Sequence, residues 1–433
     1  MSPYFITSAS FVVLFVLIIL RVPIGVAMGL VGVAGFGMLT SQDAALNLLA
    51  LSPMRTSTEY TLGLIPMFIL MGSFASASGI SADLYKSSQA WLGHFRGGLA
   101  LATIAACSGF AAICGSSVAT AATMTKVALP EMRRYGYSDK IASGTIAAGG
   151  SLGILIPPSI ILAVYGVMTR QDIGKLFLAG VIPGALAILL YCLVIIIYSR
   201  LYPDRFPNTE VTSWRDRLYS MIGVLPTLAL FTFVIGGLYA GMFTPSEGAG
   251  MGAFGTFLIG KCMGRLPWSK VLECLIDSIR VSAAIFLVLI GALLFGYFLT
   301  VSRVPQHMTE FLIGLELGSY GTLAVILIAL FLLGCILDAM AMIVLVVPII
   351  FPVILQLGFD PIWFGVIMVV AVELALITPP IGMNVFVING VAKDISLPTI
   401  FRGVMPFVLI DIVRLILLVA FPAIVLLLPS WMG

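Results

Sequence analysis

The segment GGSLGILIPPSIILAVYG at residues 149–166 is apolar but contains the doublet Pro157-Pro158. The segment AVELALITPPIGMNVFVING at residues 371–390 contains the same doublet, Pro379-Pro380, 222 residues later. Proline removes a backbone donor and clashes with the preceding helical turn, so two consecutive prolines must interrupt a helix. We therefore expect two helices, at 141–168 and 362–391, that break at matching points of the chain.

The offset between the two doublets recurs along most of the sequence. The matched features are Pro23 with Pro245, Pro130 with Pro352, Asp172-Ile173 with Asp394-Ile395 and, with a slip of one residue, GVIP at 180–183 with GVMP at 403–406. Matched helix breakers in an apolar chain are typical of the internal repeats of secondary transporters. We expect two repeats, at 1–222 and 223–433.

The composition indicates a polytopic membrane protein made of helices. Of the 433 residues, 61% are hydrophobic and 9% are charged, against roughly 25% charged in soluble proteins. Segments long and apolar enough to span a bilayer are clearest at 4–20, 24–39, 62–80, 176–199, 219–241, 282–300 and 404–429. The first lacks a positive n-region and a cleavage site, so we interpret it as a retained helix rather than a signal peptide.

Several classes of function have little support in the sequence. The chain has two histidines, His94 and His307, and none of its six cysteines forms a CxxC pair, which disfavours structural zinc and disulfide frameworks. Basic runs with interleaved aromatics are missing, so nucleic acid is not an expected partner. No nucleophile–histidine constellation lies in a polar setting, and we expect no enzyme.

The distribution of the 22 Lys and Arg residues gives a topology. Most lie in one set of loops, which the positive-inside rule makes cytoplasmic, so both termini are expected on the periplasmic side. Pro23 and Pro245 then lie on opposite sides, and the repeats are inverted. This requires 98–131 and 320–357 to be re-entrant hairpins, the first open to the cytoplasm and the second to the periplasm. The alternative is a pair of ordinary spanning helices at each place.

The predicted hairpin tips are polar. The first contains Gly115-Ser116-Ser117, three consecutive residues that favour a helix break, and the second contains Asp338, which aligns with Ser116. At such a break the carbonyls that end one arm can bind a hard cation, and the N–H groups that begin the next can face an anion. Ser116 or Ser117 is a candidate N-cap, and Asp338 is either an N-cap or a cation ligand.

The proline doublets free carbonyls near 153–156 and 376–378, although a simple kink is the alternative interpretation. Each half then supplies one tip and one broken helix. Together they form two oxygen-rich cation sites with an anion-binding cleft between them. Such sites favour coupling to sodium over coupling to protons, because a proton relay needs more intramembrane carboxylates or histidines.

Other charged residues receive structural interpretations. Glu247 is expected to cap a helix at 246–259, and Asp411 is expected to pair with Arg414. For Glu373 we favour structural pairing over a coupling role. Lys126 either extends its side chain toward the membrane–water interface or forms an ion pair. Segments 81–97 and 302–318 are expected to be amphipathic arms that brace the hairpins.

The motifs GSSVATAATMTKVALPEM, IPPS, TPPIGMN and LGCILDAM closely resemble those of the large membrane subunit of tripartite ATP-independent periplasmic (TRAP) transporters. The resemblance covers essentially the whole chain. It implies an elevator-type transporter of the ion transporter superfamily in the bacterial inner membrane, which couples Na⁺ to import of organic acids: C4-dicarboxylates, other carboxylates or sialic acid. It also implies two partners, a small four-helix membrane subunit on a separate chain and a periplasmic substrate-binding protein.

Carried onto this sequence, the resemblance implies two sodium sites and one substrate site. The sodium sites comprise Gly115, Ser116, Ser117, Gly153 and Pro157 in the first half and Gly334, Asp338, Thr378, Gly382 and Met383 in the second. The substrate site comprises Ser117, Thr120, Pro158, Pro380 and Asn384. A stand-alone sodium/anion symporter is the alternative function, and a scaffold or channel is a third that leaves the paired tips unexplained.

The inverted topology predicts the accessibility of two loop positions. In a cysteine-free background, Arg134→Cys should react with an impermeant thiol reagent only from the cytoplasm, and Gln306→Cys only from outside. Each acts as the control for the other, and reversed labelling would overturn the topology.

Overall fold

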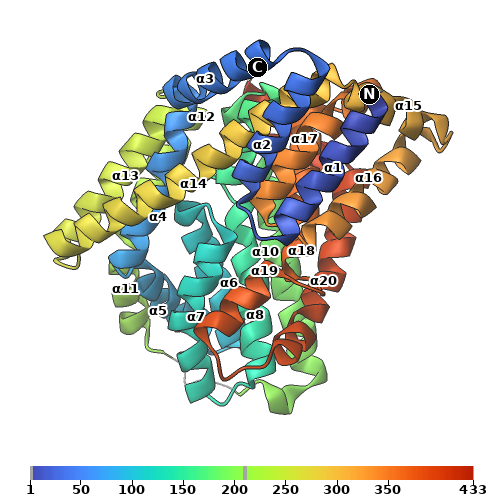
Figure 1. The fold of residues 1–433 in the computed structure, drawn as a ribbon. Helices are drawn as coiled ribbons and strands as arrows, with labels where there is room; N and C mark the ends of the chain where they lie inside the picture. Colours follow the sequence, from blue (N-terminus) through green and yellow to red (C-terminus); the bar gives the residue numbers. More distant parts are fainter. Residues whose placement is uncertain (1–2, 208–211, 433) are drawn as a thin grey trace.

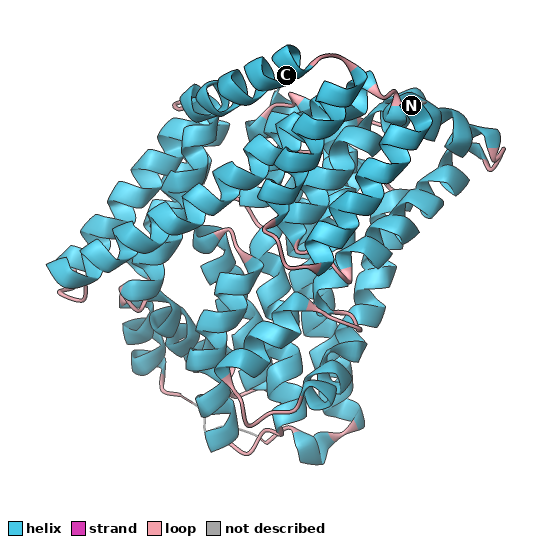
Figure 2. Cartoon of the chain, in the orientation of Figure 1, coloured by secondary structure: helices cyan, strands magenta, loops and turns pink. Residues whose placement is uncertain are grey.

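The computed structural model describes residues 3–207 and 212–432, and every secondary-structure element in these ranges is a helix (Figure 2). The predicted all-α class is confirmed. Within these ranges, five helices are long and apolar enough to cross a membrane, and a bent pair at Trp214–Ile222 and Leu225–Tyr239 adds a sixth candidate. Both termini lie at the same end of the molecule (Figure 1).

The first half of the chain contains ten α-helices and two short 3₁₀ segments among the described residues. They are α1 (Pro3–Ile19), α2 (Ile24–Leu39), α3 (Gln42–Thr58), η1 (Tyr60–Gly63), α4 (Leu64–Ala77), α5 (Ile80–Leu92), α6 (Gly98–Cys114), α7 (Ser117–Arg134), α8 (Asp139–Ser151), η2 (Leu152–Ile154), α9 (Ile160–Thr169) and α10 (Ile173–Leu201).

The second half follows a short η3 (Pro203–Arg205). Its described elements are α11 (Trp214–Ile222), α12 (Leu225–Tyr239), α13 (Pro245–Cys262), α14 (Trp268–Val301), α15 (Val304–Gly314), α16 (Gly318–Gly334), α17 (Ala339–Gln356), α18 (Pro361–Ile377), α19 (Met383–Val391), α20 (Leu397–Ala420), α21 (Ala423–Leu426) and η4 (Pro429–Met432).

Helices at corresponding places in the two halves pack in corresponding ways. Helix α2 packs along α14, and α13 along α4. In the same manner α19 contacts α7, and α9 contacts α17. Each half therefore contributes a broken helix that packs on the second arm of the other half's predicted hairpin.

The two predicted hairpins are helix pairs with breaks at the expected tips. Helices α6 and α7 meet at Gly115-Ser116, and α16 and α17 are separated by residues 335–338. Helix α17 also passes the length and composition test for a membrane span. The helix lengths alone therefore accommodate both the re-entrant arrangement and the ordinary pair.

The predicted broken helices are observed as α8–α9 and α18–α19, with a cis peptide bond in each proline doublet. Helix α18 is buried on all sides from Trp363 to Ile377, and α8 is buried from Ile141 to Ser151. Helices that are apolar all round lie inside a protein. The two helices that lead into the breaks therefore form the centre of the molecule.

The predicted cap at Glu247 is confirmed, since the Thr244 hydroxyl accepts from the Glu247 N–H at 3.3 Å and the Glu247 carboxylate accepts from the Thr244 N–H at 2.7 Å. This capping box begins α13. The predicted amphipathic arms are helical as α5 and α15.

The packing of α2 on α14 depends on glycine. A Cβ placed on Gly291 would collide with the carbonyl of Gly25, whereas a Cβ on Gly296, five residues later in α14, would meet no atom within 4 Å. We expect Gly291→Ala to destabilise the protein by about 1–3 kcal/mol through overpacking. The matched control Gly296→Ala should be neutral or slightly stabilising, because alanine favours a helix. Equal melting temperatures for the two variants would contradict this packing.

Candidate functional site

The first hairpin tip is formed by a left-handed glycine and a serine cap. Gly115 has φ of 62°, a conformation that an L-residue adopts only with strain, and it ends α6. The Ser116 hydroxyl accepts from the N–H of Ala119 at 3.4 Å and begins α7. Of the two candidate N-caps, the structure therefore selects Ser116.

This tip packs directly on the break that follows α8. A Cβ on Gly153 would lie 2.6 Å from the Ser116 oxygen, and one on Gly115 would lie 2.6 Å from the Pro158 oxygen. Backbone therefore touches backbone at two points, which brings together Gly115, Ser116, Ser117, Gly153 and Pro158. Pro157 lies on the side of the break that faces α10, 3.6 Å from a Cβ placed on Gly180.

The second tip has the same plan with a carboxylate cap. Asp338 accepts from the N–H of Ala341 at 2.6 Å and begins α17, so the N-cap role is observed. Gly334 packs on α18, because a Cβ added to this glycine would lie 2.7 Å from the Ala375 Cβ. The Cys335 sulfur lies 3.6 Å from the Pro379 oxygen, which joins this tip to the second break.

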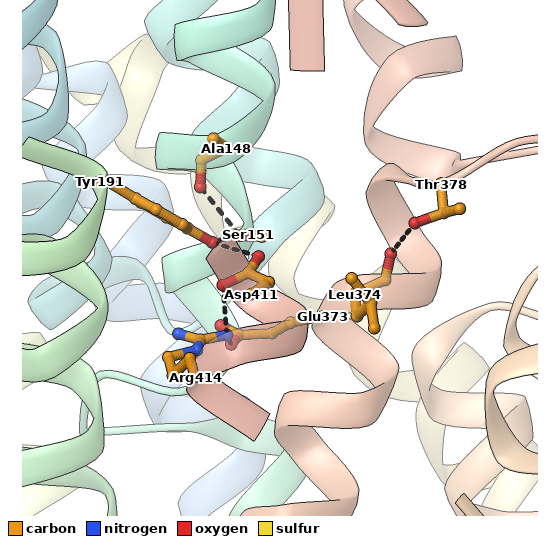
Figure 3. A network of polar contacts seen from close by, with 8 residues as sticks. All are labelled: Ala148, Ser151, Tyr191, Glu373, Leu374, Thr378, Asp411 and Arg414. Carbon is orange, nitrogen blue, oxygen red and sulfur yellow. Dashed lines mark hydrogen bonds and ion pairs between the residues drawn. The ribbon is translucent and has the colours of Figure 1, made fainter. Parts of the chain in front are cut away.

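The second break is organised by Thr378 and Gly382. The Thr378 hydroxyl donates to the Leu374 carbonyl at 2.5 Å (Figure 3). Gly382 has φ of 59° and begins α19 at Met383, with a Cβ position 3.1 Å from the Thr378 oxygen. The predicted residues Thr378, Gly382 and Met383 therefore lie together at this break.

The two tip–break units differ in exposure. In the first, Gly115, Ser117, Gly153, Pro157 and Pro158 are all buried. In the second, Asp338, Pro379 and Pro380 are exposed. The first unit is enclosed by protein, and the second is open at the surface of this conformation.

Asn384 is the most informative of the predicted substrate residues. Its side chain is fully buried, and neither its amide nitrogen nor its amide oxygen has a hydrogen-bond partner among the described residues. Buried polar groups are normally paired, so the donors and the acceptor oxygen of this amide are available to a further polar partner. Helix α19, which carries Asn384 in its first turn, packs on α7, which carries the buried Ser117 and Thr120.

The electrostatics of the two units suit ions of both signs. The C-terminal ends of α6 and α8 carry partial negative charge, and the N-terminal ends of α7 and α19 carry partial positive charge. Carbonyls at a helix end can bind a cation, and free N–H groups can bind a carboxylate. The arrangement can therefore hold a cation beside a bound anion.

An ion-pair cluster ties the far end of α7 to the chain that follows α19. Arg133 binds Asp139 at 2.6 Å and Asp394 at 2.5 Å. The Arg133 guanidinium holds the pKa of Asp394 below its ordinary value through this hydrogen bond. The cluster reinforces the packing of α19 on α7.

A second polar network lies fully buried between α10, α18 and α20 (Figure 3). Arg414 contacts Asp411 at 3.1 Å and Glu373 at 2.6 Å, which confirms the predicted pairing of Asp411 with Arg414 and the structural pairing favoured for Glu373. The hydroxyl of Tyr191 donates to Asp411 at 2.6 Å, a contact that the sequence reasoning missed. Lys126 is exposed on α7.

The hollows of the molecule are largely apolar. One lies between α8, α10 and α20 and is lined in part by Ile141, Val194, Ile195 and Phe407. Another lies beside α12 and reaches Pro158. Since the first contains no predicted site residue, we place the candidate site at the tips and breaks.

The sequence matches, over residues 11–424, the family described as "Tripartite ATP-independent periplasmic transporter, DctM component". The C4-dicarboxylate TRAP transporter large permease protein DctM of Pseudomonas aeruginosa is 38% identical, with 92% of each chain covered. The sialic acid TRAP transporter large permease protein SiaM of Vibrio cholerae is 30% identical, with 94% of this chain and 95% of that protein covered.

Two further matches concern chain length and fold. The isethionate TRAP transporter permease protein DctMQ of Oleidesulfovibrio alaskensis is 33% identical over 94% of this chain but only 64% of that protein. The crystal structure of the Alcanivorax borkumensis YdaH transporter superposes with a TM-score of 0.62 over 90% of this chain and 89% of that one. At 15% identity, this likeness supports the fold alone.

The orphaned amide of Asn384 makes a stability prediction. Asn384→Leu should leave the melting temperature of the ligand-free protein unchanged or raise it, because it removes a buried group with unmade hydrogen bonds. The matched control is Asn389→Leu on the same helix, since the Asn389 side chain donates to the Ile395 carbonyl at 2.7 Å. The free energy of unfolding of that variant should fall by about 1 kcal/mol, the contribution of one hydrogen bond. A loss in Asn384→Leu as large as in the control would show that Asn384 has a structural partner.

Proposed function

We propose sodium-coupled import of organic acids for this chain, which belongs to the DctM family of tripartite ATP-independent periplasmic transporters. Its relatives are named as transporter permeases, in agreement with the expectation that the chain is not an enzyme. The observation that carries the proposal is the buried amide of Asn384, which lies beside the two tip–break units and has no hydrogen-bond partner in the described part of the chain. A carboxylate of the substrate is its proposed partner.

The proposed architecture is a pair of inverted-topology repeats, residues 1–222 and 223–433, each with a re-entrant hairpin. The reciprocal packing of α19 on α7 and of α9 on α17 supports it, because a two-fold relation generates such pairs of contacts. The hairpins and broken helices form the moving transport domain of an elevator, and the remaining helices form its scaffold.

The proposed sodium sites are the two tip–break contacts. The first uses Gly115, Ser116, Ser117, Gly153 and Pro157, and backbone contact at that point supports it. The second uses Gly334, Asp338, Thr378, Gly382 and Met383. Backbone and hydroxyl oxygens are the ligands that helix breaks offer to hard cations.

The proposed substrate site lies between the tips and uses Ser117, Thr120, Pro158, Pro380 and Asn384. The N-termini of α7 and α19 favour a carboxylate there. The names of the relatives support C4-dicarboxylates, other carboxylates or sialic acid as the substrate class.

Two partners complete the proposed transporter. One is a separate small four-helix membrane subunit, and the greater length of the relative named DctMQ supports a second membrane component. The other is a periplasmic binding protein. We place the complex in the bacterial inner membrane with both termini in the periplasm, and their location at one end of the molecule supports a common side (Figure 1).

The function is tested by uptake into proteoliposomes that contain this chain and its small membrane partner. Labelled C4-dicarboxylate and sialic acid are offered with and without an inward sodium gradient and an added binding protein. The proposal predicts uptake that requires both. Sodium-driven uptake without the binding protein would instead support the stand-alone symporter.

The second sodium site makes a prediction for Thr378. Thr378→Ala should raise the sodium concentration for half-maximal uptake about tenfold, as expected when about 1.4 kcal/mol of binding free energy is lost. The matched control is Thr300→Ala on α14, whose hydroxyl also donates to the carbonyl four residues earlier. Equal sodium dependence in the two variants would remove Thr378 from the site.

A further inference from the structure

The buried network between α10, α18 and α20 is not used by the proposed sodium and substrate sites (Figure 3). Glu373, Asp411, Arg414 and Tyr191 are each fully buried. Glu373 accepts from Arg414 at 2.6 Å, and Asp411 accepts from Tyr191 at 2.6 Å and contacts Arg414 at 3.1 Å. These residues bring two carboxyl groups to one guanidinium.

The charges of this network do not balance. With both carboxyl groups ionised, the network would carry one uncompensated negative charge away from water, which is costly. The hydroxyl groups of the network are those of Tyr191 from α10 and Ser151 from α8, which lie 3.3 Å apart. Neither hydroxyl carries a charge that could balance the second carboxylate. The other charged residues of α8, α10 and α20 lie near the helix ends, at Asp139, Lys140, Lys175, Arg200 and Arg402.

Each carboxyl group accepts one hydrogen bond, but the two groups differ in the number of residues that they contact. Asp411 faces two donors, Tyr191 and Arg414, whereas Glu373 accepts from Arg414 through Oε2 only. The Oε1 atom of Glu373 and the Oδ1 atom of Asp411 are both buried and without a hydrogen-bond partner among the described residues, but Asp411 Oδ1 lies 3.1 Å from the Arg414 guanidinium. In a buried site, a carboxyl group with few hydrogen-bond donors is more stable in its protonated, neutral form than in its ionised form.

We propose that the Glu373–Asp411 pair binds one proton and that Glu373 holds it. A proton balances the charge without occupying space in this packed interior. A sodium ion is the poorer ligand, because the Arg414 guanidinium within 3.1 Å of both carboxyl groups repels a second cation.

The location of the proton site follows from the repeat. Glu373 corresponds to Ser151 at an offset of 222 residues, and Arg414 to Tyr191 at the slipped offset of 223. The corresponding pairs make corresponding contacts, Ser151 with Tyr191 at 3.3 Å and Glu373 with Arg414 at 2.6 Å. Asp411, whose counterpart is the apolar Ile188, joins the two pairs through Tyr191 and Arg414.

The proposed proton site lies beside the helices that lead into both breaks. Ser151 ends α8 immediately before the first break, and Glu373 lies next to Leu374, whose carbonyl accepts from Thr378 at the second break. Loss of the proton would introduce a buried negative charge between the helices that lead into both breaks. Protonation therefore stabilises the arrangement of the two tip–break units.

Infrared difference spectroscopy of the purified protein tests the site directly. At neutral pH the wild type should show the carbonyl band of a protonated carboxylic acid, with a shift in deuterated water. Glu373→Gln should remove the band, and Glu310→Gln, which changes a largely exposed glutamate on α15, should leave it. Absence of the band from the wild type, or its loss only in Asp411→Asn, would overturn the assignment.

The pH dependence of stability provides a second test that uses the same variants. The folded protein keeps a proton that the unfolded chain has released, so its stability should fall as the pH rises. In Glu373→Gln this alkaline loss should be smaller, because the amide cannot lose a proton. An equal loss in the variant, or a loss that sodium but not the substitution abolishes, would contradict the proposal. Neither test measures transport, so both are independent of the proposed function.

Discussion

A backbone that leaves the helical hydrogen-bond pattern inside a membrane must be enclosed by protein or line a water-filled cavity. This chain interrupts its helices at two tips and two proline doublets. Each tip packs on a break, with backbone contact between Gly153 and Ser116 in the first half and contact between the Cys335 sulfur and the Pro379 carbonyl in the second. Helices α8 and α18, which lead into these breaks, are buried in the centre of the molecule.

The same interruptions supply the ligands of the proposed site. A broken helix exposes carbonyls at one end and N–H groups at the other, so a pair of breaks offers ligands for a cation and an anion side by side. Side chains then add specificity. Asn384 is buried with unmade hydrogen bonds, which costs stability in the ligand-free protein and favours a polar ligand. The proton proposed at Glu373 lies behind both breaks, where it can influence them together.

The features that the sequence predicted best are those with local causes. Proline doublets, the Gly-Ser-Ser tip and the cap at Glu247 act on neighbouring residues, so their positions in the chain were sufficient. The contact of Tyr191 with Asp411 joins residues 220 positions apart, and no local pattern specifies it. The one signal in the sequence was the internal repeat, in which Tyr191 corresponds to Arg414 at an offset of 223 residues. The different exposure of the two tips depends on the conformation of the whole molecule, which no local pattern encodes.

We propose that the tip–break units and Asn384 together form one ion and substrate site. The most direct measurement is an experimental structure of the complex with sodium and a bound carboxylate. We expect cation density at both tip–break contacts and a ligand carboxylate within hydrogen-bond distance of the Asn384 amide. A ligand bound instead in the hollow between α8, α10 and α20, with the Asn384 amide still unpaired, would contradict it.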